Sequence, residues 1–111
     1  MRGMNRVILL GILGEPVRPR RTRSGVMVLD VRLATRRPGR AGDEVTDWHQ
    51  VRLWGPLAEQ CVSEAAVGDP LGVEGQLRGE SWIDREGITH QRVYIHGERV
   101  HLVPAREAPT E

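Results

Sequence analysis

The stretch from Asp47 to Trp54, followed at once by Gly55-Pro56, constrains the fold most strongly. Successive side chains of a β-strand point to opposite faces of the sheet. The alternation here predicts one apolar face, which carries Val51 and Leu53 in phase with His49. The opposite face carries Trp48, Gln50, Arg52 and Trp54. Flat aromatic surfaces interleaved with positive charge are what unpaired bases and phosphates need, so this face favours binding of single-stranded nucleic acid.

Four other segments show β-strand patterns and are separated by Gly- and Pro-rich turns. They span Met4 to Leu13, Val26 to Thr35, Leu71 to Trp82 and Thr89 to Val103. Gly11 within the first segment predicts a bulge or a bend, as at a barrel corner. Two arginine-rich stretches, residues 18–23 and 36–44, are predicted to be connections.

One helix is predicted, opening at Gly55-Pro56. Leu57, Cys61 and Ala65 share one face by their spacing, and Pro56 suits the first turn. The order of three strands, a helix and two strands predicts an all-β OB-fold, a five-stranded Greek-key barrel with its helix between strands 3 and 4. A chain of 111 residues suits one domain, which we expect over residues 1–104 with a short flexible tail over 105–111.

Charge is distributed unevenly along the chain, although the net charge is only +1. Residues 1–54 hold 11 arginines against five acidic residues, whereas residues 55–111 hold five arginines against ten. Every one of the 16 basic residues is arginine, which stacks on bases as well as pairing with phosphate. The asymmetry indicates a basic face, while the preference for arginine fits genome composition equally well.

Several functional classes find no support in the sequence. No apolar run approaches the roughly 20 residues of a membrane span, and no export signal is present, so we expect a cytoplasmic protein. The lone Cys61 excludes an internal disulfide framework. His90, His96 and His101 lack the short ligand spacing of a zinc site. No nucleophile with a base and no phosphate-cradling loop is present, so we predict no enzyme, no metal and no cofactor.

The ordered set of motifs resembles the bacterial single-stranded DNA-binding protein (SSB) family over most of residues 5–103. The matching pieces are Asn5-Arg6-Val7-Ile8-Leu9-Leu10-Gly11, Leu13-Gly14, Leu33-Ala34-Thr35, Asp47-Trp48-His49, Leu53-Trp54-Gly55, Leu57-Ala58-Glu59 and Val73-Glu74-Gly75-Gln76-Leu77-Arg78, reaching Trp82. Each piece alone is weak evidence for the family. Together the pieces stand in the family's order and at its spacing, and the ordered set is strong evidence.

The resemblance implies an OB-fold that assembles as a homotetramer and wraps single-stranded DNA without sequence preference, in replication, recombination or repair at the nucleoid. It places base stacking on Trp48, Trp54 and Trp82 and phosphate contacts on Arg6 and Arg78. It places His49 in the oligomer interface. From the residues themselves we add four expected nucleic-acid contacts, which are Gln50, Arg52, Arg36 and Arg37.

Three departures from the family pattern bear on function. Arg36-Arg37-Pro38-Gly39 stands where the family often has a further tryptophan. Glu80 and Ser81 precede Trp82, where the family tends to carry positive charge, which lowers the expected affinity or moves the path of the strand. The Gly-rich linker and acidic tip through which family members recruit replication and repair proteins are not found before Glu111. We therefore expect either a trimmed chain or a tail-less paralogue, in which replication and repair proteins stay possible partners although the recruiting tip is not found.

The main alternative is an OB-fold module that binds protein, such as a primosome component or an oligomerisation subunit. In that case the tryptophans would pack in protein interfaces. The two hypotheses differ in whether the loop arginines flank the aromatic rings on one surface. A small nuclease is a more distant third possibility.

Overall fold

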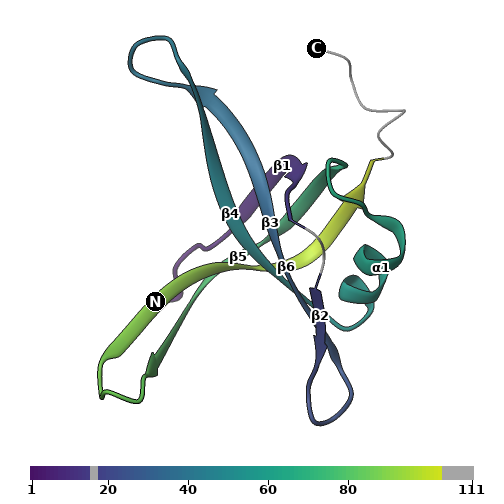
Figure 1. Ribbon diagram of the computed structural model, residues 1–111, viewed down its shortest axis with the longest axis vertical. Coiled ribbons are helices and arrows are strands. Elements are labelled where there is room, and N and C mark those ends of the chain that lie inside the picture. The colour runs from purple at the N-terminus through teal and green to yellow at the C-terminus, as the bar shows by residue number, and fades with distance from the viewer. Residues whose placement is uncertain (16–17, 104–111) are drawn as a thin grey trace.

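The computed structural model describes residues 1–15 and 18–103, which form six strands and one helix. The elements are β1 (Val7–Leu13), β2 (Arg18–Arg21), β3 (Met27–Pro38), β4 (Glu44–Trp54), α1 (Pro56–Glu64), β5 (Pro70–Ile83) and β6 (Thr89–Leu102). Long hairpins project from a small barrel in three directions (Figure 1). The boundary expected at residue 104 and the tail expected over 105–111 lie outside the described residues.

Five of the strands close into a barrel. The sheet runs β1-β5-β6-β4-β3, and β1 also pairs with β3 at Ile12 and Leu13, which closes the ring. The pairs are antiparallel except for β4 and β6, which pair in parallel at Val51 and Arg52. The helix follows the third barrel strand and precedes the fourth. The predicted OB-fold is therefore confirmed.

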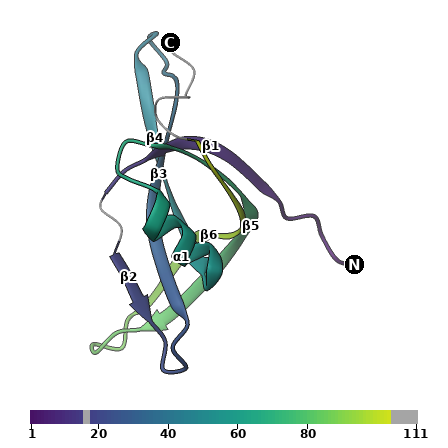
Figure 2. The ribbon, with the colours of Figure 1, turned by 90° about the vertical axis from the view of Figure 1, so that its right-hand side faces the viewer.

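The apolar phase of the barrel strands β3 and β4 fills the barrel interior, as the alternation predicted. Leu29, Leu33, Val51 and Leu53 are completely buried. Cys61 of α1 belongs to the same core cluster, and the helix packs against β3, β4 and β6 (Figure 2). Burial raises the pKa of the Cys61 thiol, so this side chain behaves as a small apolar group.

Glycine allows close backbone approaches at two barrel positions. A Cβ atom on Gly11 would lie 2.3 Å from the Ala34 carbonyl oxygen, at the corner where β1 turns from β5 towards β3. A Cβ atom on Gly75 would lie 1.9 Å from the His96 carbonyl oxygen, beside the register shift between β5 and β6. Strand curvature at these points therefore depends on the absence of a side chain.

Both predicted connections are partly strand in the structure. Residues 18–21 form β2, which pairs with β3, although all four side chains are exposed and give no apolar alternation. The predicted loop over residues 36–44 is shorter than expected, because β3 continues to Pro38 and β4 begins at Glu44. Cross-strand pairing of the β3–β4 hairpin extends these strands beyond the barrel core. Within the described part of the chain, no helix has the length and apolar character that crossing a membrane requires.

Candidate nucleic-acid interface

The outward face of β4 carries the side chains that the alternation assigned to it. Trp48 and Trp54 are 49% and 40% exposed, whereas Val51 and Leu53 on the other face are completely buried. Gln50 lies between the two tryptophans in the same phase and is half-buried. Both indole rings therefore lie outside the barrel, available to a flat ligand.

Trp48 is held between a glycine and an arginine. A Cβ atom on Gly14 would lie 2.5 Å from Cζ3 of the indole, so the ring rests against this backbone. The Arg32 guanidinium lies 4.6 Å from the ring centroid, and its Nη1 donates to the Glu15 carboxylate at 2.7 Å. The cation and the aromatic ring form a mixed platform that combines stacking surface with a phosphate donor.

Arg52 occupies the centre of this face but is largely buried. Its Nε donates to Asp30 at 2.8 Å, its Nη1 donates to Glu80 at 3.0 Å, and its guanidinium lies 4.4 Å from the centroid of the Tyr94 ring. Burial alone would lower the pKa of Arg52, but the hydrogen bonds to Glu80 and Asp30 raise it. The phosphate contact expected of Arg52 finds no support in this placement. Its contacts instead join β3, β4, β5 and β6.

Trp82 forms a second platform on the β5–β6 hairpin. Its ring is 44% exposed and stacks on His90, its cross-strand partner, with centroids 5.3 Å apart. His90 is also hydrogen-bonded to Asp84 at 2.7 Å, which lowers the pKa of that carboxyl group. The Arg92 guanidinium lies 5.2 Å from the centroid of the Trp82 indole. Aromatic surface and positive charge meet here as they do at Trp48.

A chain of ion pairs joins Arg52, on the outward face of β4, to the Trp82 platform. Glu80 of β5 accepts hydrogen bonds from Arg52 of β4 and from Arg92 of β6, and Arg92 lies over the Trp82 ring. Arg52 shares the outward phase of β4 with Trp48 and Trp54. These ion pairs therefore connect the strand that carries Trp48 and Trp54 with the hairpin that carries Trp82.

The two arginines predicted at positions 36 and 37 lie on opposite faces of β3. Arg36 shares the phase of Arg32 and pairs with Glu44 at 3.5 Å. Arg37 donates to Asp47, which is in phase with the inward-facing residues of β4, at 2.7 Å. That hydrogen bond lowers the pKa of Asp47. Only Arg36 is therefore on the tryptophan side of the hairpin.

The remaining predicted residues are spread over the barrel. Arg78 is exposed opposite Tyr94, with no ion pair among the residues that the structure describes. Arg6 precedes β1 and pairs with Glu74 at 2.9 Å. His49 is half-buried, and its Nε2 shares a hydrogen bond with the Thr35 hydroxyl at 2.8 Å.

Acidic side chains offset much of the positive charge on the tryptophan face. Glu15, Asp30 and Glu80 each pair with an arginine of that face. Sequence reasoning missed Arg32, Arg92 and His90 as contributors. The alternation along Thr89–Leu102 could have identified Arg92 and His90, because it places both side chains on the same outward face as Tyr94. Within residues 1–15 and 18–103, no three His, Cys, Asp or Glu side chains gather in a way that could hold a metal ion.

Comparison with known proteins agrees with this arrangement. The model of the single-strand binding protein family matches residues 4–103. The single-stranded DNA-binding protein 1 of Chlorobaculum tepidum is 36% identical over 89 residues, which cover 77% of this chain and 55% of that protein. The chain thus spans about half the length of this relative.

Proposed function

This chain belongs to the single-strand binding protein family, and from that premise we propose that it binds single-stranded DNA without sequence preference and catalyses no reaction. The observation that carries the proposal is the exposure of all three indoles, each 40–49%, outside a barrel whose apolar core is complete without them. Each base stacked on such a ring contributes about 1–3 kcal/mol. Because every base has an aromatic face, stacking gives affinity without sequence readout.

Phosphate contacts supply the second part of the proposed mechanism. Arg36 and Arg78 are exposed, and Arg32 lies directly over Trp48. A strand stacked on the indoles passes these guanidinium groups, and each neutralised phosphate adds roughly −0.7 to the log–log salt slope for a single strand. Gln50 can bind sugar or base edges between the two tryptophans of β4. Arg6, paired with Glu74, is proposed as a contact on the family resemblance alone.

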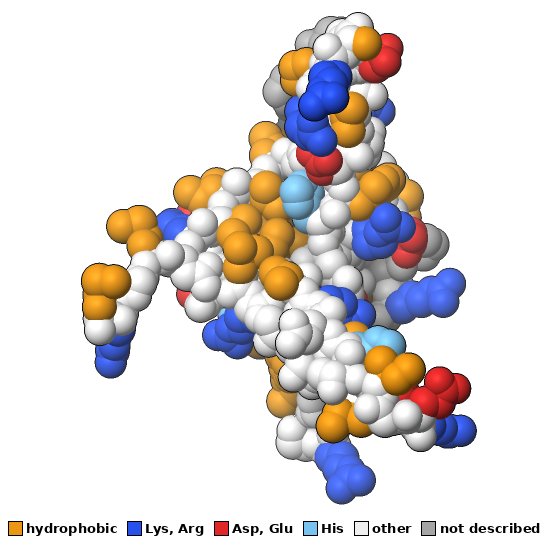
Figure 3. Space-filling model, turned by 90° about the vertical axis from the view of Figure 1, so that its left-hand side faces the viewer, with side chains coloured by type: hydrophobic (Ala, Val, Ile, Leu, Met, Phe, Trp, Pro, Cys, Tyr) orange, Lys and Arg blue, Asp and Glu red, His pale blue; other side chains and the backbone are white. Residues whose placement is uncertain are grey.

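We further propose that the protein acts as a homo-oligomer, and specifically as a tetramer. β1 pairs with β5 over residues 7–12 but with β3 only at Ile12 and Leu13, so one edge of its first part has no strand partner among the described residues. Ile8 and Leu10 on this strand are each 67% exposed. Hydrophobic side chains also gather at the centre of the face in Figure 3, between the projecting arms. A second copy that covers β1 would bury both the edge and its apolar side chains.

Oligomerisation would strengthen DNA binding, because two or three platforms per subunit give moderate affinity on their own. Several subunits that share one strand gain affinity through effective concentration. His49 remains our proposed interface position. We propose that residues 1–104 form the DNA-binding domain and that it serves replication, recombination or repair at the nucleoid.

A titration of fluorescent dT oligonucleotides, followed by anisotropy and by solution mass, tests the function. An oligomer that binds dT with a negative salt slope between about 50 and 200 mM salt is the expected result. Equal binding of dA and dC strands would support stacking. Failure to bind any single strand at the lower salt concentration would contradict the proposal and favour the protein-binding module.

A further inference from the structure

Two tryptophan platforms share one arrangement, in which a carboxylate holds the guanidinium that lies over the indole. Glu15 holds Arg32 over Trp48, and Glu80 holds Arg92 over Trp82. The two carboxylates differ in their surroundings. The Glu15 side chain is 63% exposed and is paired with one arginine, whereas that of Glu80 is 28% exposed and is paired with two.

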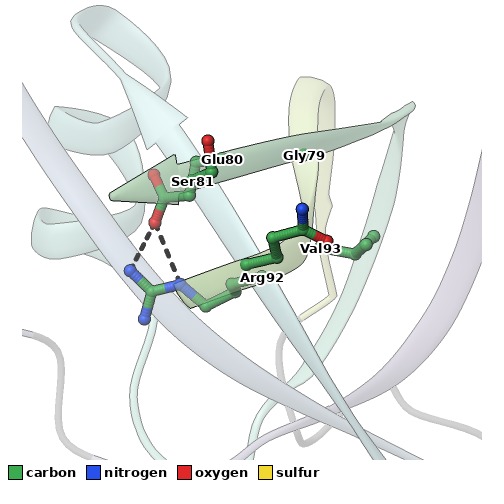
Figure 4. A pocket seen from close by; sticks show the side chains of 6 residues that line it. Gly79, Glu80, Ser81, Arg92 and Val93 are labelled. Carbon is green, nitrogen blue, oxygen red and sulfur yellow. Dashed lines mark hydrogen bonds and ion pairs between the residues drawn. The ribbon is translucent and has the colours of Figure 1, made fainter. Parts of the chain in front are cut away.

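Glu80 is bound on both of its carboxylate oxygens. One oxygen accepts from Nε of Arg92 at 2.9 Å and from an Nη of the same guanidinium, and the other accepts from Arg52 at 3.0 Å. Figure 4 shows Glu80 reaching from β5 towards the Arg92 guanidinium on β6. The two residues line a shallow hollow of about 510 Å³ together with Gly79, Ser81, Gln91 and Val93. A carboxylate in this position occupies the donors that a phosphate would use.

We infer that Glu80 is an internal competitor of phosphate for Arg92. In the unbound protein the Glu80 carboxylate occupies Arg92. When a strand stacks on Trp82, its phosphate displaces that carboxylate and pairs with the guanidinium. This inference rests on the proposed function and adds Arg92 as a DNA contact, with Glu80 as the residue that sets how strongly it binds.

Exposure decides which of the two arginines changes partner. The side chain of Arg92 is 42% exposed, whereas that of Arg52 is 9% exposed and is also held by Asp30. Arg52 therefore keeps its place when Glu80 moves. The phosphate must displace a carboxylate that already occupies Arg92, so the wild type should gain less affinity from this arginine than a variant without the carboxylate.

The test compares Glu80→Gln, Arg92→Gln and the double variant with the wild type in dT binding at several salt concentrations. Glu64→Gln is the matched control, because it removes the same charge from α1, on the other side of the barrel from the β5–β6 hairpin (Figure 1). Glu80→Ala serves as a second variant that removes the side-chain oxygens altogether. Circular dichroism of each variant is the check that it retains its β-structure.

We expect Glu80→Gln to bind dT several-fold more tightly than the wild type, because the phosphate at Arg92 then has no carboxylate to displace. Arg92→Gln should weaken binding, and the double variant should match Arg92→Gln because no competition remains. Arg92 Nε–H in the nitrogen-15-labelled wild type should shift on addition of dT more than Arg52 Nε–H.

Three results would overturn the inference. Glu80→Gln and Glu80→Ala could bind no more tightly than Glu64→Gln, or the gain could persist in the double variant, which would indicate a general charge effect. The Arg92 signal could also stay unchanged in saturated wild-type protein. In each case the wild type still binds DNA and the proposed function stands. A wild-type protein that does not bind dT overturns both.

Discussion

The rings of Trp82 and His90 stack across the β5–β6 hairpin with their centroids 5.3 Å apart and their planes inclined by 16°. The two residues are direct cross-strand partners, and Asp84 fixes the imidazole through a 2.7 Å hydrogen bond. Because these contacts limit the rotamers of both rings, the hairpin presents a preorganised aromatic surface. Preorganisation reduces the entropy lost when a base stacks on it.

Replacement of Trp82 should cost more affinity than replacement of His90. Trp82→Ala removes the exposed stacking surface and should weaken dT binding by about 1–3 kcal/mol, the usual contribution of one stacked base. His90→Ala leaves the indole in place but loosens it, so the loss should be smaller, and His90→Phe should restore most of it. Anisotropy titrations of the three variants with labelled dT measure these affinity losses and rank them. A larger loss for His90→Ala would indicate that the imidazole itself is the main contact.

Trp54→Ala should weaken binding to dT, dC and dA strands by similar factors. The Trp54 ring is 40% exposed on the outward face of β4, and stacking on it does not depend on hydrogen-bonding groups of the base. Parallel titrations with the three strands provide the measurement. A change of preference for one base would instead require hydrogen-bond readout at this position.

The barrel could be predicted from the sequence because β3 and β4 place their large apolar side chains mainly in one alternating phase. Leu29, Leu33, Val51 and Leu53 are all completely buried, and the outward tryptophans follow from the same phase. The short strand β2 could not be predicted in this way. All four of its side chains are exposed, so its pairing with β3 leaves no hydrophobic pattern in the sequence.

The candidate site was predictable in its aromatic residues but not in its electrostatics. Arg52 shares the phase of the tryptophans, which suggested a phosphate contact, yet Asp30 and Glu80 come from strands far away in sequence and enclose it. Ion pairs of this kind depend on which strands become neighbours, and local alternation carries no such information. The same holds for Glu80 and Arg92, which meet only because β5 and β6 pair.

Gly75→Ala should destabilise the fold, whereas Gly79→Ala should not. A Cβ atom at position 75 would lie 1.9 Å from the His96 carbonyl oxygen, but at position 79 the nearest atom, the carbonyl oxygen of Arg92, would lie 4.0 Å away. Overpacking of this kind costs about 1–3 kcal/mol. Denaturant unfolding of the two variants, both within β5, gives the comparison. Equal denaturant midpoints for the two variants would show that the backbone at Gly75 shifts without a loss of folding stability.

Acid should remove the stabilising contribution of Glu80. Hydrogen bonds from Arg52 and then Arg92 lower the pKa of this carboxyl group from 4.5 to about 2. The pKa of Glu80 is lower in the folded state than in the unfolded state. The Glu80 carboxylate therefore makes its full contribution to folding stability above the unfolded-state pKa, and that contribution is lost as the pH falls towards the folded-state pKa. Wild type and Glu80→Gln should therefore differ in unfolding midpoint at neutral pH and converge near pH 2. A difference independent of pH would contradict this assignment.

The intrinsic fluorescence of the tryptophans during titration with a dT oligonucleotide shows directly whether bases stack on the indoles. The sequence contains three tryptophans, and all three lie half-exposed on the outside of the barrel. If bases stack on these rings, emission should fall in proportion to the bound fraction that anisotropy of a labelled strand reports independently. An emission spectrum that stays unchanged while the labelled strand binds would contradict stacking on the indoles.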